Sequence, residues 1–239
     1  MKRVPLSRRV TAEFIGTGLL VAAVVGSGIM ADRLSGGNVA LALLANTMAT
    51  GAVLVALIAA LGPISGAHLN PVVTVMSAVQ GGLPWREASP YVAGQVLGGI
   101  CGTVIAHSMF GLSAVSFSTH ARSGFAQALS EFVATFGLMA VIWGTSRVQW
   151  VAVPFAVGAY ITAAYWFTAS TSFANPAVTI ARCLSDTFAG IRPVDVPAFL
   201  VAQFLGGFAA TALFRWLAPS RATDCWSAVE AERSVVTDG

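Results

Sequence analysis

Six apolar runs, each of 20 to 23 residues, most constrain what this chain can fold into. They lie at about residues 10–31, 39–61, 90–110, 124–145, 150–169 and 197–217. A transmembrane helix needs about 20 predominantly apolar residues to cross the hydrocarbon core of a bilayer. Only 10% of the residues are charged, whereas soluble domains carry about 25%. The sequence therefore predicts an all-α integral membrane protein with six transmembrane helices in contact with lipid.

The distribution of charge and of reactive side chains excludes several classes of protein. The formal net charge is +3, but the charges lie near the chain ends and in short connections, without a basic patch interleaved with aromatic residues. This pattern argues against nucleic-acid binding. The three cysteines are odd in number and lack Cys-x-x-Cys spacing, so we expect neither a disulfide framework nor a metal site. The sequence has no Ser-His-Asp cluster and no phosphate-binding loop, so we expect no enzyme, no catalytic residues and no cofactor.

Two Asn-Pro pairs interrupt the series of spans, one between the second and third span and one between the fifth and sixth. Asn is a strong helix N-cap and Pro is favoured at the first helical position, so each pair marks the start of a helix. Ten or eleven helical residues extend roughly 15–16 Å, half of the ~30 Å hydrocarbon core. The sequence predicts two re-entrant half-helices that meet head to head in mid-membrane. Their junction comprises Asn70, Pro71 and Val72 with Asn175, Pro176 and Ala177.

The chain repeats itself, because three features recur in the same order at separations of 105 to 118 residues. The matching residues are Glu13 and Glu131, Asn70 and Asn175, and Gln95 and Gln203. Each half, about 10–110 and 124–217, contains three spans and one re-entrant segment, and an odd number of crossings inverts the second half relative to the first. Inverted repeats with interrupted segments at matching positions place a substrate path at the repeat interface. We expect one channel domain over 1–217 and a cytoplasmic tail over 218–239.

The loops before the two Asn residues are the predicted chemical elements of this path. Non-helical backbone at membrane depth persists only where it is buried in protein or lines a watery cavity. We expect pore-facing carbonyl oxygens from Gly66, Ala67, His68, Ser170, Thr171 and Phe173. Each Asn would cap its own helix and direct an amide donor into the path. The two helix N-termini would add positive partial charge that excludes cations and protons.

These residues resemble the major intrinsic protein family, which comprises the aquaporins and aquaglyceroporins. The resemblance covers residues 10 to 217 and is carried by the segment 65–74, the Asn175-Pro176-Ala177 motif, the two Glu residues and the paired Gln-x-x-Gly-Gly segments. It implies a right-handed six-helix bundle, one pore per subunit and a homotetramer. It also implies that Glu13 and Glu131 accept backbone N–H bonds from the re-entrant loops. A proton relay is the alternative role for these intramembrane carboxylates.

Two departures from the family pattern bear on selectivity. Val72 stands where the family usually has Ala, which adds two methyl groups near the helix junction. Val178 stands where most members have the Arg of the outer filter. Counting from the motifs assigns the outer filter to Thr50, Ala163, Ser172 and Val178. These side chains are small and uncharged, which predicts a wide filter, and we expect Arg182 to point outward to the interface or a loop.

An arginine-free filter resembles that of the channels found with bacterial arsenic-resistance functions. We therefore expect a passive channel for small uncharged solutes: glycerol-like polyols and metalloid acids such as arsenous acid and methylated arsenicals, with water also permeating. The alternatives are a water-selective aquaporin, an ion-coupled secondary transporter and an adhesion protein with a closed pore. Linear, uncoupled flux would favour the channel.

Positive charge sets the expected orientation. Six spans place both termini on one side, and the basic residues of the N-terminus, with those in two connections, place that side in the cytoplasm. The chain would then lie in a bacterial inner membrane. We interpret His68 as a residue that fixes its loop, with a pH gate as the alternative, and we expect His107 and His120 to be solvated.

Overall fold

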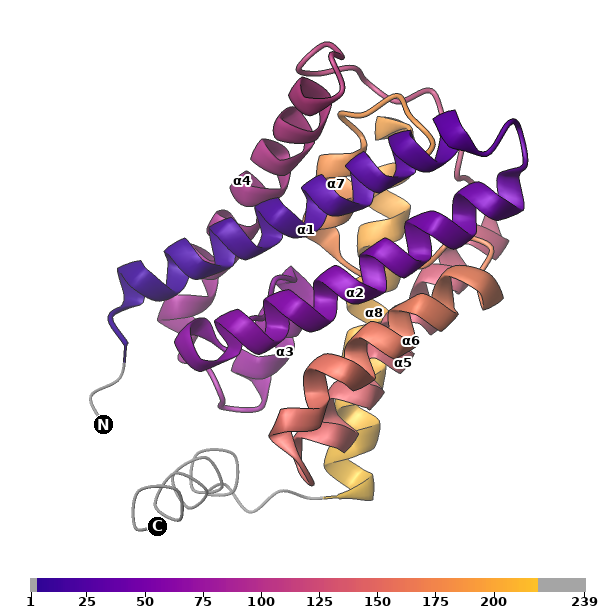
Figure 1. Cartoon of the computed structure of the whole chain (residues 1–239). Coiled ribbons are helices and arrows are strands. Elements are labelled where there is room, and N and C mark those ends of the chain that lie inside the picture. The colour runs from indigo at the N-terminus through magenta and orange to yellow at the C-terminus, as the bar shows by residue number, and fades with distance from the viewer. Residues whose placement is uncertain (1–3, 219–239) are drawn as a thin grey trace.

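The computed structural model describes residues 4–218, which form a bundle of six long helices enclosing two short ones (Figure 1). The long helices are α1 (Leu6–Leu34), α2 (Val39–Ser65), α4 (Trp85–Met109), α5 (Phe125–Ser146), α6 (Val153–Phe167) and α8 (Val196–Leu217). Single 3-10 turns, η1 (Trp150–Ala152) and η2 (Pro193–Asp195), precede α6 and α8. Six helical segments are long and apolar enough to cross a membrane, as the sequence predicted. Residues 219–239, which include Cys225 and nearly all of the predicted tail, lie outside the described residues.

The two short helices begin where the Asn-Pro pairs predicted. Helix α3 covers Pro71–Val79 and α7 covers Pro176–Arg182. With 9 and 7 residues they are shorter than expected, extending only about 13 and 10 Å. Helix α7 ends early because the backbone N–H groups of Leu184 and Ser185 donate to the carbonyls three residues back, which tightens the last turn.

Glycines bring the long helices of each half into close contact. A Cβ at Gly98 or Gly102 of α4 would overlap the backbone of α1, and a Cβ at Gly206 of α8 would overlap the backbone of α5. Helices α1 and α4 thus pair in the first half as α5 and α8 pair in the second. Small residues at such crossings let membrane helices pack closely without a hydrophobic driving force. The repeat seen in the sequence is therefore a repeat in packing.

Candidate channel site

The two half-helices meet through their Asn residues. The side-chain oxygen of Asn70 caps α3 by accepting from Val72 N (2.9 Å), and that of Asn175 caps α7 by accepting from Ala177 N (3.0 Å). Each amide nitrogen crosses to the other half: Asn70 Nδ2 donates to the Ala174 carbonyl (2.8 Å) and Asn175 Nδ2 to the Leu69 carbonyl (2.7 Å). This reciprocal exchange brings the two helix N-termini, with their positive partial charges, to one point.

The loops that lead to the Asn residues are not helical and are held in unusual backbone conformations. Ala67, Leu69, Thr171, Ser172 and Ala174 have φ between 46° and 61° although none is glycine. Such residues persist only where the surroundings fix them. Within the described residues, no hydrogen bond reaches the carbonyl oxygens of Gly66, Ala67, His68, Thr171 and Phe173. The Ser170 carbonyl, which was also predicted to face the pore, accepts from Arg122 Nη1 (3.0 Å).

Glu13 fixes the first loop. One carboxylate oxygen accepts from Ser65 Oγ (2.6 Å) and from His68 N (2.9 Å). The other accepts from Leu69 N (2.6 Å) and from Gln95 Nε2 (2.8 Å). The His68 ring lies 3.1 Å from a threonine hydroxyl of α3, which joins the loop to its helix. The carboxylate therefore accepts four hydrogen bonds, two of them from the backbone of the first loop.

Glu131 fixes the second loop in the same way. Its carboxylate accepts from Phe173 N (2.9 Å), Ala174 N (2.8 Å) and Gln203 Nε2 (2.6 Å). Gln203 also donates to Thr179 Oγ1 (2.9 Å) of α7. The two carboxylates thus hold equivalent positions, one behind each loop, and all their hydrogen bonds are accepted from the framework.

The assignment of Ala163 to the outer filter is wrong. Ala163 lies on the exposed face of α6, with Phe155 and Trp166, and points away from the bundle interior. Two residues further on, Tyr165 is buried and its hydroxyl lies 3.3 Å from Thr50 Oγ1. Helical phase advances about 100° per residue, so a count that is off by two residues selects a different face.

The other three predicted filter residues lie in the interior. Thr50 donates to the Asn46 carbonyl (2.9 Å), and Val178 is packed in an apolar cluster with Tyr165. The Ser172 hydroxyl is buried and has no hydrogen-bond partner in the described part of the chain. An unpartnered hydroxyl at membrane depth is a costly arrangement unless a solute or water supplies the partner.

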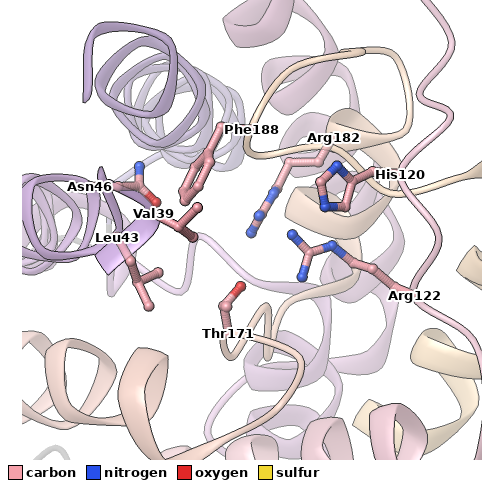
Figure 2. A pocket seen from close by; sticks show the side chains of 8 residues that line it. All are labelled: Val39, Leu43, Asn46, His120, Arg122, Thr171, Arg182 and Phe188. Atoms are coloured by element: carbon pink, nitrogen blue, oxygen red, sulfur yellow. The ribbon is translucent and has the colours of Figure 1, made fainter. Parts of the chain in front are cut away.

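Arg182 reaches a loop, which was one of the two places predicted for it, but its side chain is buried and is not directed outward. Its Nε donates to the Ala189 carbonyl in the connection after α7. With Arg122, His120 and Thr171 it lines a cavity of about 170 Å³ (Figure 2). This cavity lies at the end of the bundle where α1 ends and α2 begins, here called the distal mouth. Partial burial and the two neighbouring arginines lower the pKa of His120 below 6.5, so it is neutral at pH 7.

The Val72 side chain lies against Gly207 of α8, where a Cβ would overlap it. One further expectation is corrected by the packing. His107 is not solvated: it is 1% exposed and its ring nitrogens lie 2.7 Å from the Ser113 carbonyl and 2.8 Å from Ser185 Oγ. It fastens the end of α4 to the distal connections. Among the described residues, no group of three His, Cys, Asp or Glu side chains could hold a metal ion.

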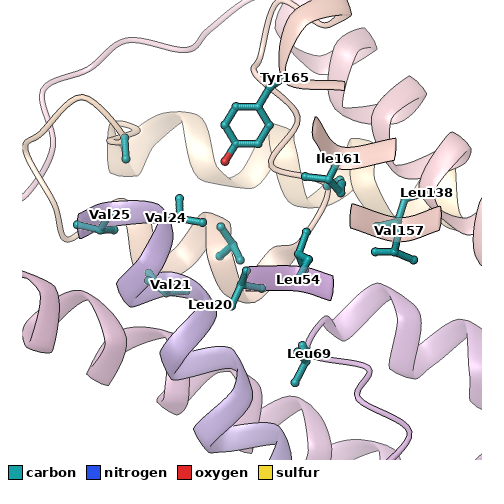
Figure 3. Close-up of a cluster of buried hydrophobic side chains, with 14 of the residues drawn as sticks. Leu20, Val21, Val24, Val25, Leu54, Leu69, Leu138, Val157, Ile161 and Tyr165 are labelled. Carbon is teal, nitrogen blue, oxygen red and sulfur yellow. The ribbon is translucent and has the colours of Figure 1, made fainter. Parts of the chain in front are cut away.

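An apolar cluster lines the boundary between the two halves (Figure 3). It includes Leu20 and Val24 of α1, Leu54 of α2, Ile161 of α6 and Val178 of α7. Leu69 and Ala174, the residues before the two Asn, belong to the same cluster. Polar loop backbone and apolar side chains therefore meet along this boundary.

An inverted repeat with two capped half-helices meeting in its interior defines a membrane channel that passes water and small solutes. The profile of the major intrinsic protein family matches residues 1–149 and 144–238, and the chain belongs to this family. It is 58% identical over 217 residues to Aquaglyceroporin AqpS of Rhizobium meliloti (strain 1021), covering 91% of this chain and 93% of that protein.

More distant proteins agree with this assignment. The chain is 31% identical over 242 residues to Probable aquaporin AqpM of Archaeoglobus fulgidus, covering 89% of this chain and 98% of that protein. The X-ray structure of the aquaglyceroporin from Plasmodium falciparum superposes with a TM-score of 0.68 at 20% identity, covering 90% of this chain and 98% of that one. The chain is thus an integral membrane channel for small neutral solutes and water, and not an enzyme.

Proposed function

We propose that the chain is a passive channel whose preferred solutes are small uncharged polyols and metalloid acids, with water also permeating. The observation that carries this proposal is the reciprocal Asn70–Asn175 exchange, beside loops in which several carbonyl oxygens accept no hydrogen bond from the described residues. The two positive helix ends at this junction repel cations, while carbonyl oxygens and hydroxyls accept from a neutral solute. The proposed path runs between the halves, through the predicted junction and filter residues Thr50, Ser172 and Val178.

The composition of the path supports a polyol-like solute. In the proposed path, loop carbonyls that accept no hydrogen bond from the described residues would face the apolar cluster that includes Leu20, Leu54, Ile161 and Val178. A molecule with hydroxyl groups along one edge and carbon along the other can satisfy both sides, whereas water uses only the polar side. The Tyr165 and Thr50 hydroxyls would meet the solute at the distal mouth.

Metalloid acids fit the same requirements. Arsenous acid and methylated arsenicals are uncharged hydroxylated molecules near glycerol in size, and the small Val178 in the usual arginine position leaves room for them. The similarity to an aquaglyceroporin supports the polyol part, and the metalloid part rests on the resemblance to arsenic-resistance channels. We further propose a homotetramer in a bacterial inner membrane with cytoplasmic termini, and residues 1–217 as one channel domain.

A secondary transporter is the rival function, and the carboxylates argue against it. Glu13 and Glu131 each accept at least three hydrogen bonds from framework donors. Both carboxylates are thus engaged in holding the loops, which favours a structural role over a proton relay.

The test is stopped-flow light scattering on proteoliposomes that contain the full chain. Glycerol, urea, arsenous acid and water should permeate with rates linear in concentration and unaffected by a proton or sodium gradient. A saturable, gradient-dependent rate would establish coupled transport and overturn the proposal. A water rate without any glycerol or arsenous acid rate would establish the water-selective alternative.

A further inference from the structure

Two arginines from distant parts of the chain converge on the distal mouth. Arg122 comes from the connection between α4 and α5, and Arg182 is the last residue of α7. In Figure 2 both guanidinium groups extend into the cavity, with the Thr171 hydroxyl beside them. The side chains of Asn46 and Phe188 form the opposite wall (Figure 2). Two guanidinium groups of like charge repel each other, so other contacts are needed to keep them in one small cavity.

Neutral groups of the second re-entrant loop and of the connection after α7 hold both arginines. The Phe173 ring lies 3.4 Å from the guanidinium carbon of Arg182 and 5.0 Å from that of Arg122. Arg122 Nε donates to the Gly190 carbonyl (2.8 Å) and its Nη1 to the Ser170 carbonyl. Carbonyl oxygens and an aromatic face orient a guanidinium, but they do not neutralise its charge.

The acidic residues of this region are engaged elsewhere. Within residues 4–218, no carboxylate oxygen lies within 4.0 Å of either guanidinium. Asp195 is ion-paired with Arg192 and accepts from the backbone N–H of Arg122 (2.8 Å), not from its guanidinium group. Asp186 accepts from Thr119, and Glu131 accepts from the loop backbone. Arg182 is 2% exposed, and its Nη1 is buried without a hydrogen-bond partner among the described residues. Arg182 is one of the residues that line the cavity, and a buried charged donor without an acceptor is costly.

We propose that Arg122 and Arg182 form a binding site for a small monovalent oxyanion of the carboxylate class at the distal mouth. A guanidinium presents its N–H groups in a planar fork that matches two oxygens of one anion. A cavity of about 170 Å³ limits the ligand to a few heavy atoms. If the proposed conduction path is correct, an anion bound here obstructs it and slows the flux of neutral solutes.

The first measurement is independent of conduction. Full-length protein in detergent at pH 7.5 is unfolded thermally in sodium formate and in sodium chloride of equal ionic strength. Formamide, which is neutral and of similar shape, serves as the charge control. Formate at ten times its dissociation constant should raise the unfolding temperature by roughly 3–6 °C relative to chloride. Formamide should have no effect, and an equal effect of formate and formamide would overturn the proposal.

Thr171 offers a matched pair of variants that leaves both arginines in place. Its φ is 61°, a conformation that Asp and Asn tolerate. Thr171→Asp adds a carboxylate beside the guanidinium groups and should abolish the formate shift, whereas Thr171→Asn should retain it. An equal formate shift in the two variants, or no shift in the unmodified chain, would refute the site. Formate binding in a protein that passes no glycerol would refute the proposed function alone, and formate that binds without slowing glycerol flux would refute the obstruction.

Discussion

The two halves of this channel have the same framework, but they differ in the partners of the arginines that lie near their re-entrant loops. In the first half, Arg9 donates to the hydroxyl of Tyr91, which in turn donates to the Ser65 carbonyl at the end of α2. Arg9 also pairs with Glu87 at 2.9 Å, so its charge is neutralised. In the second half, the guanidinium groups of Arg122 and Arg182 lie beside the corresponding loop, where they contact carbonyl oxygens and an aromatic ring. The carboxylates behind the loops, Glu13 and Glu131, are equivalent.

This difference distinguishes features that the fold requires in both halves from features that are found only at the distal mouth. The loop clamps occur twice because each re-entrant loop exposes backbone N–H groups at membrane depth, and these need a buried acceptor. Among the described residues, buried arginines without a carboxylate partner on their guanidinium groups lie beside a re-entrant loop only in the second half, at the distal mouth. The symmetric features therefore serve structure, and the asymmetric ones distinguish the two entrances of the proposed path.

The largest expected effect is the loss of either loop clamp. Glu13→Ala and Glu131→Ala each leave at least two buried backbone N–H groups unsatisfied, at about 1–3 kcal/mol per group. Thermal unfolding in detergent should show comparable destabilisation for both variants, or no folded protein. Glu13→Gln and Glu131→Gln retain an acceptor oxygen and should be milder. If one half tolerated the Ala change and the other did not, the structural equivalence of the halves would be disproved.

The next effect tests the asymmetric mouth. Val178→Arg adds a long cationic side chain to the boundary cluster, where Val178 is only 5% exposed. We expect glycerol flux into proteoliposomes to fall by about tenfold or more, corresponding to about 1.4 kcal/mol in barrier height, with a smaller loss of water flux. Val178→Leu controls for size without charge and should retain more glycerol flux. Equal loss of both fluxes, or of neither, would remove Val178 from the proposed filter.

A third effect concerns how tightly each half-helix packs against the glycine of the long helix beside it. Val72 of α3 faces Gly207, whereas the equivalent Ala177 of α7 has its carbonyl near Gly99. A Cβ at Gly207 would overlap a Val72 methyl, while at Gly99 it would lie 3.2 Å from its neighbours. We expect Gly207→Ala to cost about 1–3 kcal/mol through overpacking and Gly99→Ala to cost less.

The double variant Val72→Ala with Gly207→Ala distinguishes overpacking from a general effect of the substitution. It should recover most of the stability lost in Gly207→Ala, as measured by thermal unfolding in detergent. Failure to recover would mean that the Val72–Gly207 contact does not explain the departure from Asn-Pro-Ala in the first motif.

The framework was predictable because its physical signals are local. Long apolar runs mark the spans, and Asn-Pro marks the two helix starts observed at Pro71 and Pro176. The paired Glu residues also recur at matching places in the two halves. Each of these signals depends on a few neighbouring residues, so a sequence read without coordinates retains them.

The distal mouth was not predictable in the same way, because its residues are brought together by helix lengths and connections. Counting twelve residues back from Asn175 gave the exposed Ala163 instead of the buried Tyr165. Arg182 was expected to lie within a longer half-helix, but α7 ends at it and its side chain enters the cavity. Arg122 had no motif, and only its proximity to the second loop gives it a role. The available signal was an arginine in a connection without a nearby acidic residue.

The smallest expected effect concerns the connections that cover the distal mouth and have no counterpart in the first half. Asp186 accepts from Thr119 N (2.8 Å) and Thr119 Oγ1 (3.0 Å), and these hydrogen bonds lower its pKa below 3.8. Because the folded pKa is depressed, the stabilisation is complete above the unfolded value and is lost as pH falls through the folded one. Hydrogen exchange at the Thr119 amide, corrected for intrinsic rates, should therefore accelerate only at strongly acidic pH.

Two variants of Asp186 test the same hydrogen bonds at neutral pH. Asp186→Ala should show the faster exchange at pH 7, and Asp186→Asn should not. The Ser116 amide, which donates to the Leu184 carbonyl, serves as the internal reference. Unchanged protection of the Thr119 amide in Asp186→Ala would show that backbone hydrogen bonds alone hold these connections together.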